Sequence, residues 1–166
     1  QELAEGMLEN LVQLFNRFGF IPNASQMYQL SHSQPPILTS YIRLIHQTGS
    51  KNDAWLQERM AVAEREYEQV WTSQAHPFWH QVYHGLSRYY DIHVLHDLAE
   101  AESGWDMTTR FSRKCLDYVP IDLNTYLYKY EADFERAATI LHKPTEAQDW
   151  HKIALKRKKT INRIMW

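Results

Sequence analysis

The stretch "PIDLNTYLYKYEADFERAATILHKPTEAQDW", residues 120–150, decides the fold. Apolar side chains recur in it every three or four residues from Leu123 to Phe134, which is the period of a helix with one buried face. Proline is favoured in the first turn of a helix, where its missing N–H would be unpaired anyway. Pro120 and Pro144 therefore each introduce a helix, and the short link between the two helices predicts a helical hairpin.

Outward from this hairpin, the helical period continues through most of the chain. It predicts a first helix that ends near Gly19, and further helices that begin at Pro35, Asn52 and Pro77. A shorter helix is expected within residues 93–101. No stretch alternates apolar and polar residues over a useful length, so strands are not expected. Six or seven helices, joined in pairs, make the chain all-α, as a bundle or as part of an α/α toroid.

On each long helix, the apolar residues that share a face are expected to form the core. They are Leu3, Met7, Leu11, Leu14 and Phe18; Leu38, Tyr41, Ile42 and Ile45; Leu56, Met60, Ala63, Tyr67, Val70 and Trp71; Trp79, Val82, Tyr83 and Leu86; and Trp150, Ile153, Ile161 and Ile164. The chain ends on Met165 and Trp166 without a polar tail. We expect these two side chains to be covered, which favours a longer parent protein or a partner.

Length and composition limit the class of protein. The 166 residues suffice for a single helical domain over residues 1–166 with a real core. A net charge of −2 gives no strong field for nucleic acid or a membrane surface, and no apolar run could span a bilayer. Cys115 is the only cysteine, which excludes an internal disulfide and favours a reducing, cytoplasmic compartment. The aromatic content of 13% suits a core and also a sugar-binding cleft.

Histidine spacing raises the question of a metal site. His76, His80 and His84 follow one another at intervals of four, as ligands on one helix face do, and His93 and His96 are three apart. No nearby acid completes a known motif, so exposed or aromatic-packed histidines are the favoured interpretation. No metal and no other cofactor is expected.

Two connections are too long and too polar-aromatic to be simple links. The first covers residues 20–36, and loops of this length without helical period tend to be functional or disordered. The second, "ESGWDMTTRF", covers residues 102–111. In it, Asp106 suits a helix N-cap with Arg110 as its ion-pair partner. Alternatively, Asp106 is a general acid kept protonated by burial beside Trp105, as glycoside cleavage requires.

Three segments together resemble the trehalase family of glycoside hydrolases. "FGFIPNASQMYQLSHSQPP" is similar to the family's IPN and SQPP segment, "ESGWDMTTRF" to its SGWD segment, and "YVPIDLNTYLYKYE" to its VPVDLN segment. The segments occur in the family's order and cover nearly the whole chain. The resemblance implies part of an (α/α)6 toroid and an inverting cleavage of an α-glucosidic bond.

The resemblance also implies roles for the matched residues. Asp106 occupies the position of the catalytic acid, and Gly104 that of a residue whose backbone contacts the sugar. Asn23, Ser33 and Gln34 match substrate-binding positions.

Other positions near the two loops either depart from the family's pattern or are expected to hold the catalytic acid in place. His32 stands where the family has an arginine that binds sugar hydroxyls, and a histidine cannot reproduce the fork of a guanidinium. The family's Arg-Pro-Glu-Ser loop before SGWD has no counterpart. Trp105 and Arg110 are expected to hold the acid in place beside the sugar.

The family's catalytic base is a glutamate beyond the last residue of this chain. We therefore expect an incomplete catalytic domain that is inactive in isolation, with trehalose or a related α-glycoside as its ligand. Self-association or the rest of the catalytic domain would supply its protein partner. Two alternatives stay open: a relative that acts on glucosyl-glycerate, mannosyl-glycerate or oligosaccharides, and a non-catalytic module that binds sugar or serves in assembly.

Two spatial expectations follow from this interpretation. Asp106 should lie in a partly enclosed cleft with Trp105 packed behind it, because a general acid must stay protonated near neutral pH. The 22–36 loop should pack beside the 102–111 turn and bring Asn23 and Gln34 towards the same site.

Overall fold

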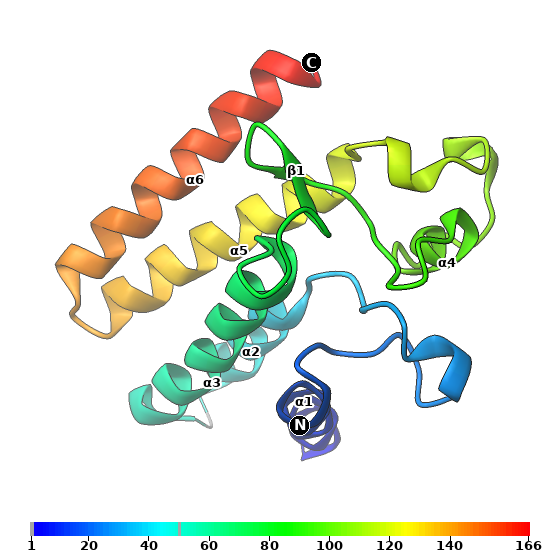
Figure 1. Ribbon diagram of the computed structural model, residues 1–166. Helices are drawn as coiled ribbons and strands as arrows, with labels where there is room; N and C mark the ends of the chain where they lie inside the picture. The colour runs from blue at the N-terminus through cyan, green and yellow to red at the C-terminus, as the bar shows by residue number, and fades with distance from the viewer. Residues whose placement is uncertain (1, 50) are drawn as a thin grey trace.

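The computed structural model describes residues 2–49 and 51–166 and shows a mainly helical chain with long irregular segments (Figure 1). Its α-helices are α1 (Glu2–Phe18), α2 (Leu38–Gln47), α3 (Asp53–Glu66), α4 (His96–Ala101), α5 (Ile121–Ile140) and α6 (Pro144–Ile164). A π-helical turn, η2 (Tyr67–Trp71), extends α3, and short 3₁₀ turns are η1 (Met27–Gln29), η3 (Thr109–Phe111) and η4 (Cys115–Asp117). Two short strands, β1 (Gln81–Tyr83) and β2 (Leu86–Ser87), form an antiparallel hairpin. The all-α prediction is confirmed.

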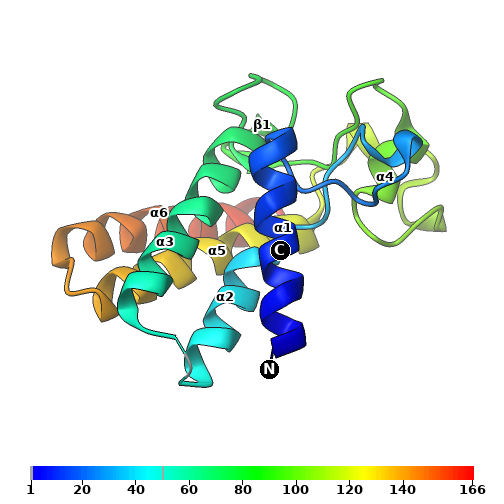
Figure 2. The same ribbon diagram turned by 90° about the horizontal axis from the view of Figure 1, so that it is seen from below.

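Helix α5 lies at the centre of the helical part. It pairs along its length with α6 on one side and contacts α2 and α3 on the other, while α1 lies across α2 and α3 (Figures 1 and 2). The irregular segments, including the 20–36 loop and the region around α4, gather at the end opposite the α5–α6 link. Within residues 2–49 and 51–166, no helix has the length and apolar character needed to cross a membrane.

Helices α2 and α3 bury the faces that the sequence predicts. Leu38, Ile42 and Ile45 of α2 are buried, and on α3 and its π-helical extension so are all the expected residues from Leu56 to Trp71. The expected residues recur at helical spacing on one face of each helix, and α3 also buries Val62 beside them. The Asn52 cap is also confirmed, because its side chain accepts a hydrogen bond from Trp55 N at 3.0 Å.

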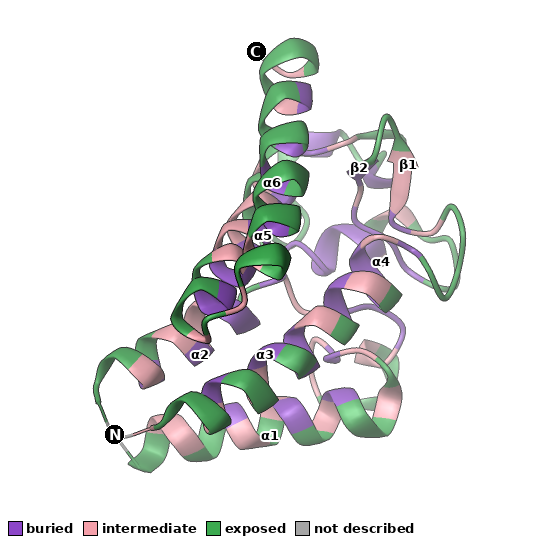
Figure 3. Cartoon of the chain, turned by 90° about the vertical axis from the view of Figure 1, so that its left-hand side faces the viewer, coloured by how far each residue is buried: buried purple, intermediate pink, exposed green. Residues whose placement is uncertain are grey.

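The buried faces of α1 and α6 differ from the prediction. Leu3 and Met7 of α1 are 79% and 52% exposed, because the helix packs through the neighbouring stripe of Leu8, Val12 and Phe15 (Figure 3). Helix α1 carries two adjacent apolar stripes, so the helical period allows either stripe to be the buried one. Contact with α2 and α3 decides which stripe is buried.

On α6, an ion pair with α5 determines which face of the helix is buried. Arg157 is buried and its Nε donates to Glu131 of α5 at 2.6 Å. This pair turns Trp150 and Ala154 into the core and leaves Ile153 40% exposed. At the end of the helix, Trp166 is 95% exposed within this chain, and its cover by further protein stays a prediction.

The helix expected from Pro77 to Leu86 is absent, and the prediction is wrong there. Residues 73–88 form a loop and the β1–β2 hairpin, and Ser73 and Phe78 have φ values of 58° and 70°, which an α-helix cannot contain. The Ser73 hydroxyl accepts hydrogen bonds from the backbone N–H of His80 and Gln81, both at 2.9 Å. Tertiary hydrogen bonds therefore override the local period.

A buried hydrogen-bond network joins α3, α5 and the start of α2. Tyr130 of α5 donates its hydroxyl proton to Glu66 of α3 at 3.0 Å, and the same hydroxyl accepts from Leu38 N at 2.7 Å. The other carboxyl oxygen of Glu66 accepts from Trp71 Nε1 at 3.2 Å. Glu66 is fully buried, and this burial raises its pKa from the usual 4.5 to about 7.

The raised pKa of Glu66 predicts a pH-dependent stability. Between about pH 4.5 and 7 the folded chain keeps a proton that the unfolded chain releases, so the contribution of Glu66 is complete in acid and is lost as pH rises through that window. Glu66→Gln removes this titration. Relative to the parent chain, its free energy of unfolding should improve by about 2–3 kcal/mol between pH 5 and pH 8, measured by urea denaturation. An equal difference at both pH values would contradict the raised pKa.

Candidate functional site

The 20–36 loop doubles back on itself before α2 begins. Pro22 and Ser33 form an antiparallel bridge, Asn23 N donates to His32 O at 3.2 Å, and Gln34 N donates to Ile21 O at 2.7 Å. The Gln34 side chain closes the turn by donating to the backbone carbonyl of Asn23 at 2.6 Å. The loop thus has its own backbone ladder, which holds Asn23 and Gln34 next to each other.

This loop packs against the 102–111 turn, as the sequence predicts. Asn23 Nδ2 donates to Ala101 O at 3.0 Å, and Ser33 N donates to Glu102 Oε1 at 2.9 Å. Gly104 has φ of 71°, and a Cβ there would lie 3.8 Å from Pro35 Cγ. Two segments nearly 80 residues apart in sequence therefore meet at one place in the fold.

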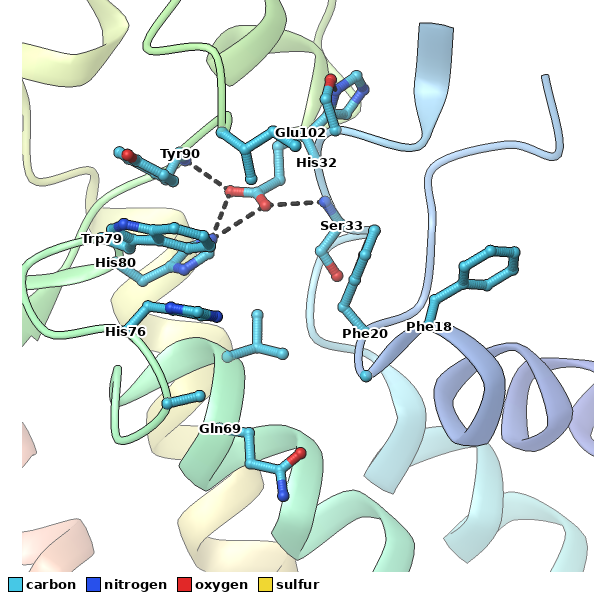
Figure 4. Close-up of a pocket in the computed structure, with 15 residues that line it drawn as sticks. Phe18, Phe20, His32, Ser33, Gln69, His76, Trp79, His80, Tyr90 and Glu102 are labelled. Carbon is cyan, nitrogen blue, oxygen red and sulfur yellow. Dashed lines mark hydrogen bonds and ion pairs between the residues drawn. The ribbon is translucent and has the colours of Figure 1, made fainter. Parts of the chain in front are cut away.

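Glu102 lies at the meeting point and is fully buried. Its carboxylate accepts from Ser33 N, from Tyr90 N at 2.7 Å, and from His80 Nε2 at 3.0 and 3.1 Å (Figure 4). Hydrogen bonds to a charged group contribute about 1.5–3 kcal/mol each, and a buried carboxylate needs them to offset its lost hydration. Sequence reasoning missed this role, because two of the three donors are backbone N–H groups that leave no trace in residue identity.

The turn that carries Asp106 is anchored on both sides. Before it, the Ser103 hydroxyl donates to Glu100 O at 2.6 Å and accepts from Trp105 N at 3.1 Å. After it, the buried Glu100 carboxylate accepts from the N–H and hydroxyl of Thr108 at 2.8 and 2.9 Å. Asp106 is thus presented by a short segment with fixed ends.

The surroundings of Asp106 differ from the expected cleft. Asp106 is exposed, and Trp105 is 57% exposed, so neither side chain is enclosed within this chain. Thr108, not Asp106, caps the following 3₁₀ turn. Arg110 pairs with Asp122 at 2.9 Å instead of Asp106, because its guanidinium lies over the Phe111 ring, 4.2 Å from the centroid, and points to the start of α5.

The expected sugar-binding residues fall into two groups. Asn23 and Gln34 are partly exposed, and Gly104 is exposed beside them in the fold. The side chains of His32 and Ser33 are buried: His32 Nδ1 is 3.7 Å from Asp91 Oδ1, and the Ser33 hydroxyl donates to Ile21 O at 3.1 Å. The structure therefore gives His32 and Ser33 contacts inside the protein.

A cavity of about 310 Å³ lies where the 20–36 loop meets Glu102 (Figure 4). Its walls include Phe18 and Phe20 on one side and His76 and Trp79, stacked at 3.8 Å, on the other. His80 and Glu102 form part of the lining, whereas Asn23 and Asp106 do not. In the part of the chain that the structure describes, no group of three or more His, Cys, Asp or Glu side chains is arranged to hold a metal ion.

Comparison with known proteins connects this geometry to a family. The trehalase family model matches residues 1–93 and 74–166. The chain is 29% identical to the cytosolic neutral trehalase of Neurospora crassa and 30% identical to the periplasmic trehalase of Xanthomonas campestris, over 99% of this chain in both cases. The solved structure of neutral trehalase Nth1 from Saccharomyces cerevisiae superposes with a TM-score of 0.85 at 27% identity, over 98% of this chain.

The matches differ in length from this chain. It covers 31% of the N. crassa protein, 36% of the X. campestris protein and 40% of the Nth1 chain. The N. crassa match runs over 236 positions, 70 more than the 166 residues present here, so this relative has internal segments without a counterpart. The matching parts nevertheless include both loops and every helix, and the chain belongs to the trehalase family.

Proposed function

We propose that this chain is the part of a trehalase-like inverting α-glycosidase that carries the general acid, Asp106, together with one sugar-binding loop. The observation that supports this most strongly is the contact between the two loops through Asn23 and Ala101 and through Ser33 and Glu102. Segments similar to the family's IPN and SGWD segments thereby share one surface. A sugar bound at Asn23 and Gly104 would lie next to the acid.

In the proposed reaction, Asp106 protonates the glycosidic oxygen as the bond to the leaving sugar breaks. A general acid must hold its proton until that moment, and cover from water favours the protonated form. Asp106 is exposed in this chain, so bound substrate or further protein has to supply that cover. The rigid turn contributes the position of the acid.

An inverting enzyme also needs a general base about 6.5–9.5 Å from the acid, with a water molecule between them. Three of the acids close to Asp106 in sequence already have partners. Glu100 holds Thr108, Glu102 holds Ser33 and Tyr90, and Asp122 accepts from Arg110 and from the Tyr89 hydroxyl at 2.9 Å. We therefore assign the base to protein outside these residues.

The substrate class is a carbohydrate, with trehalose as the first candidate because the relatives are named trehalases. One observation favours a second candidate. The position of the family's arginine holds His32, whose side chain is buried, so the loop offers no guanidinium there. Glucosyl-glycerate, mannosyl-glycerate and oligosaccharides are therefore the alternative substrates, and a non-catalytic sugar-binding module is the alternative function.

A functional Asp106 should contribute little to stability. Its side chain is exposed and caps no helix, so Asp106→Asn should change the free energy of unfolding by no more than about 0.5 kcal/mol in urea denaturation. Asp122→Asn is the matched control, and it should cost about 1–3 kcal/mol because two donors lose a charged acceptor. A loss in Asp106→Asn as large as in the control would favour a structural role for Asp106.

The isolated chain should release no measurable glucose from trehalose. General acid catalysis alone contributes about 10²–10⁴-fold, which leaves glycoside cleavage far too slow for an ordinary assay. The same sample should still bind sugar weakly, and in an NMR titration trehalose should shift the amide signals of Asn23 and Gly104. Glucose release that disappears in Asp106→Asn would show that a base lies within this chain or in a second copy of it. Trehalose and the alternative sugars all leaving these signals unmoved would contradict the proposed function.

A further inference from the structure

The Glu102 carboxylate receives a backbone hydrogen bond at each of its two oxygens. Oε1 accepts from Ser33 N, Oε2 accepts from Tyr90 N, and His80 Nε2 lies within 3.1 Å of both oxygens. Each oxygen thus faces a backbone N–H donor. An amide in its place would direct an NH₂ group at a backbone N–H, and the side chain is fully buried, so water cannot relieve that conflict.

The three donors belong to three different segments. Ser33 belongs to the bridged 22–34 loop, Tyr90 follows strand β2, and His80 precedes strand β1 (Figure 4). The backbone N–H of His80 also donates to the Ser73 hydroxyl, and this hydrogen bond fixes the position of His80. One side chain therefore ties the loop, the hairpin region and the end of α4 together.

The position of Glu102 in the chain makes this tie relevant to the acid. Glu102 directly follows α4 and lies four residues before Asp106, while Ser33 is bridged to Pro22, the neighbour of Asn23. The other hydrogen bond between loop and turn runs from the Asn23 side chain to Ala101 O. The distance between Asn23 and Asp106 thus depends on Glu102 and on this bond.

We infer that Glu102 is a positioning residue, which aligns the Asn23 loop with the Asp106 turn so that both can contact one sugar. Its side chain is fully buried, so we assign it no contact with a sugar bound at Asn23 and Gly104. The inference rests on the proposed function for the identity of the ligand. The alignment itself is a property of the folded chain and can be tested without any ligand.

The test compares Glu102→Gln and Glu102→Asp with Glu66→Gln. Glu66 is the matched control, because it is another fully buried glutamate with hydrogen bonds, but it lies among the helices and not at the loops. Hydrogen exchange measured by NMR should speed up at the Ser33 and Tyr90 amides by about tenfold or more in Glu102→Gln, with the amides of α5 unchanged. Glu102→Asp keeps the charge and should restore part of the protection. Glu66→Gln should leave both loop amides at parent rates.

A sugar titration separates positioning from plain stability. Glu102→Gln should weaken the trehalose-induced shifts at Asn23 and Gly104 by about fivefold or more in affinity, whereas Glu66→Gln should leave the affinity unchanged even where its stability differs. If the parent chain binds no sugar, the proposed function fails, and the exchange measurement still decides whether Glu102 aligns the loops.

Parent-like hydrogen exchange at the Ser33 and Tyr90 amides in Glu102→Gln would overturn the inference. If both Glu102 variants fail to fold, the parent chain is studied instead, in a series of low urea concentrations. There the Ser33 and Tyr90 amides should share one opening free energy. Independent opening of the two amides would show that Glu102 does not join their segments.

Discussion

A carboxylate that leaves water loses its hydration and must regain it from hydrogen-bond donors or neutralise its charge. Four glutamates in this chain are at most 1% exposed: Glu66, Glu100, Glu102 and Glu131. Each accepts hydrogen bonds. Glu66, Glu102 and Glu131 accept them from segments distant in sequence, and Glu100 accepts them from Thr108 across its own turn. The arrangement of both the helices and the loops depends on meeting this requirement.

The four glutamates lie in two parts of the molecule. We call the packed helices the helical layer and the irregular segments around residues 20–36 and 102–111 the loop layer. Glu66 and Glu131 bind Tyr130, Tyr67 and Arg157 among the helices, where aromatic rings such as Tyr67, Phe134 and Trp150 pack edge to face around them. Glu100 and Glu102 bind mainly backbone and hydroxyl groups of the loops. Most of the buried apolar side chains of the core belong to the helical layer, and the loop layer is joined by directional hydrogen bonds.

This division fits the glycosidase function that we propose. An acid and its sugar contacts need accurate placement on exposed loops, which apolar packing alone provides poorly. Buried carboxylates beneath the loops can fix backbone positions and leave the upper surface free for substrate. The chain spans between 31% and 40% of the N. crassa, X. campestris and Nth1 proteins, yet it contains both loops and their support in one continuous piece.

The sequence by itself determined the helical class, the faces of α2 and α3, and the meeting of the two loops. The apolar residues of α2 and α3 recur at helical spacing, and the resemblance of the two loops to segments of one family predicted that they lie close together. It did not determine the faces of α1 and α6, where two stripes compete and contacts such as Arg157 with Glu131 decide. Tertiary structure alone made a hairpin of residues 81–87, since hydrogen bonds to Ser73 and Asn124 outweigh the local helical period. It alone also left Asp106 exposed and gave Glu102 donors from separate segments, because accessibility and backbone donors are properties of the folded chain that residue identity does not record.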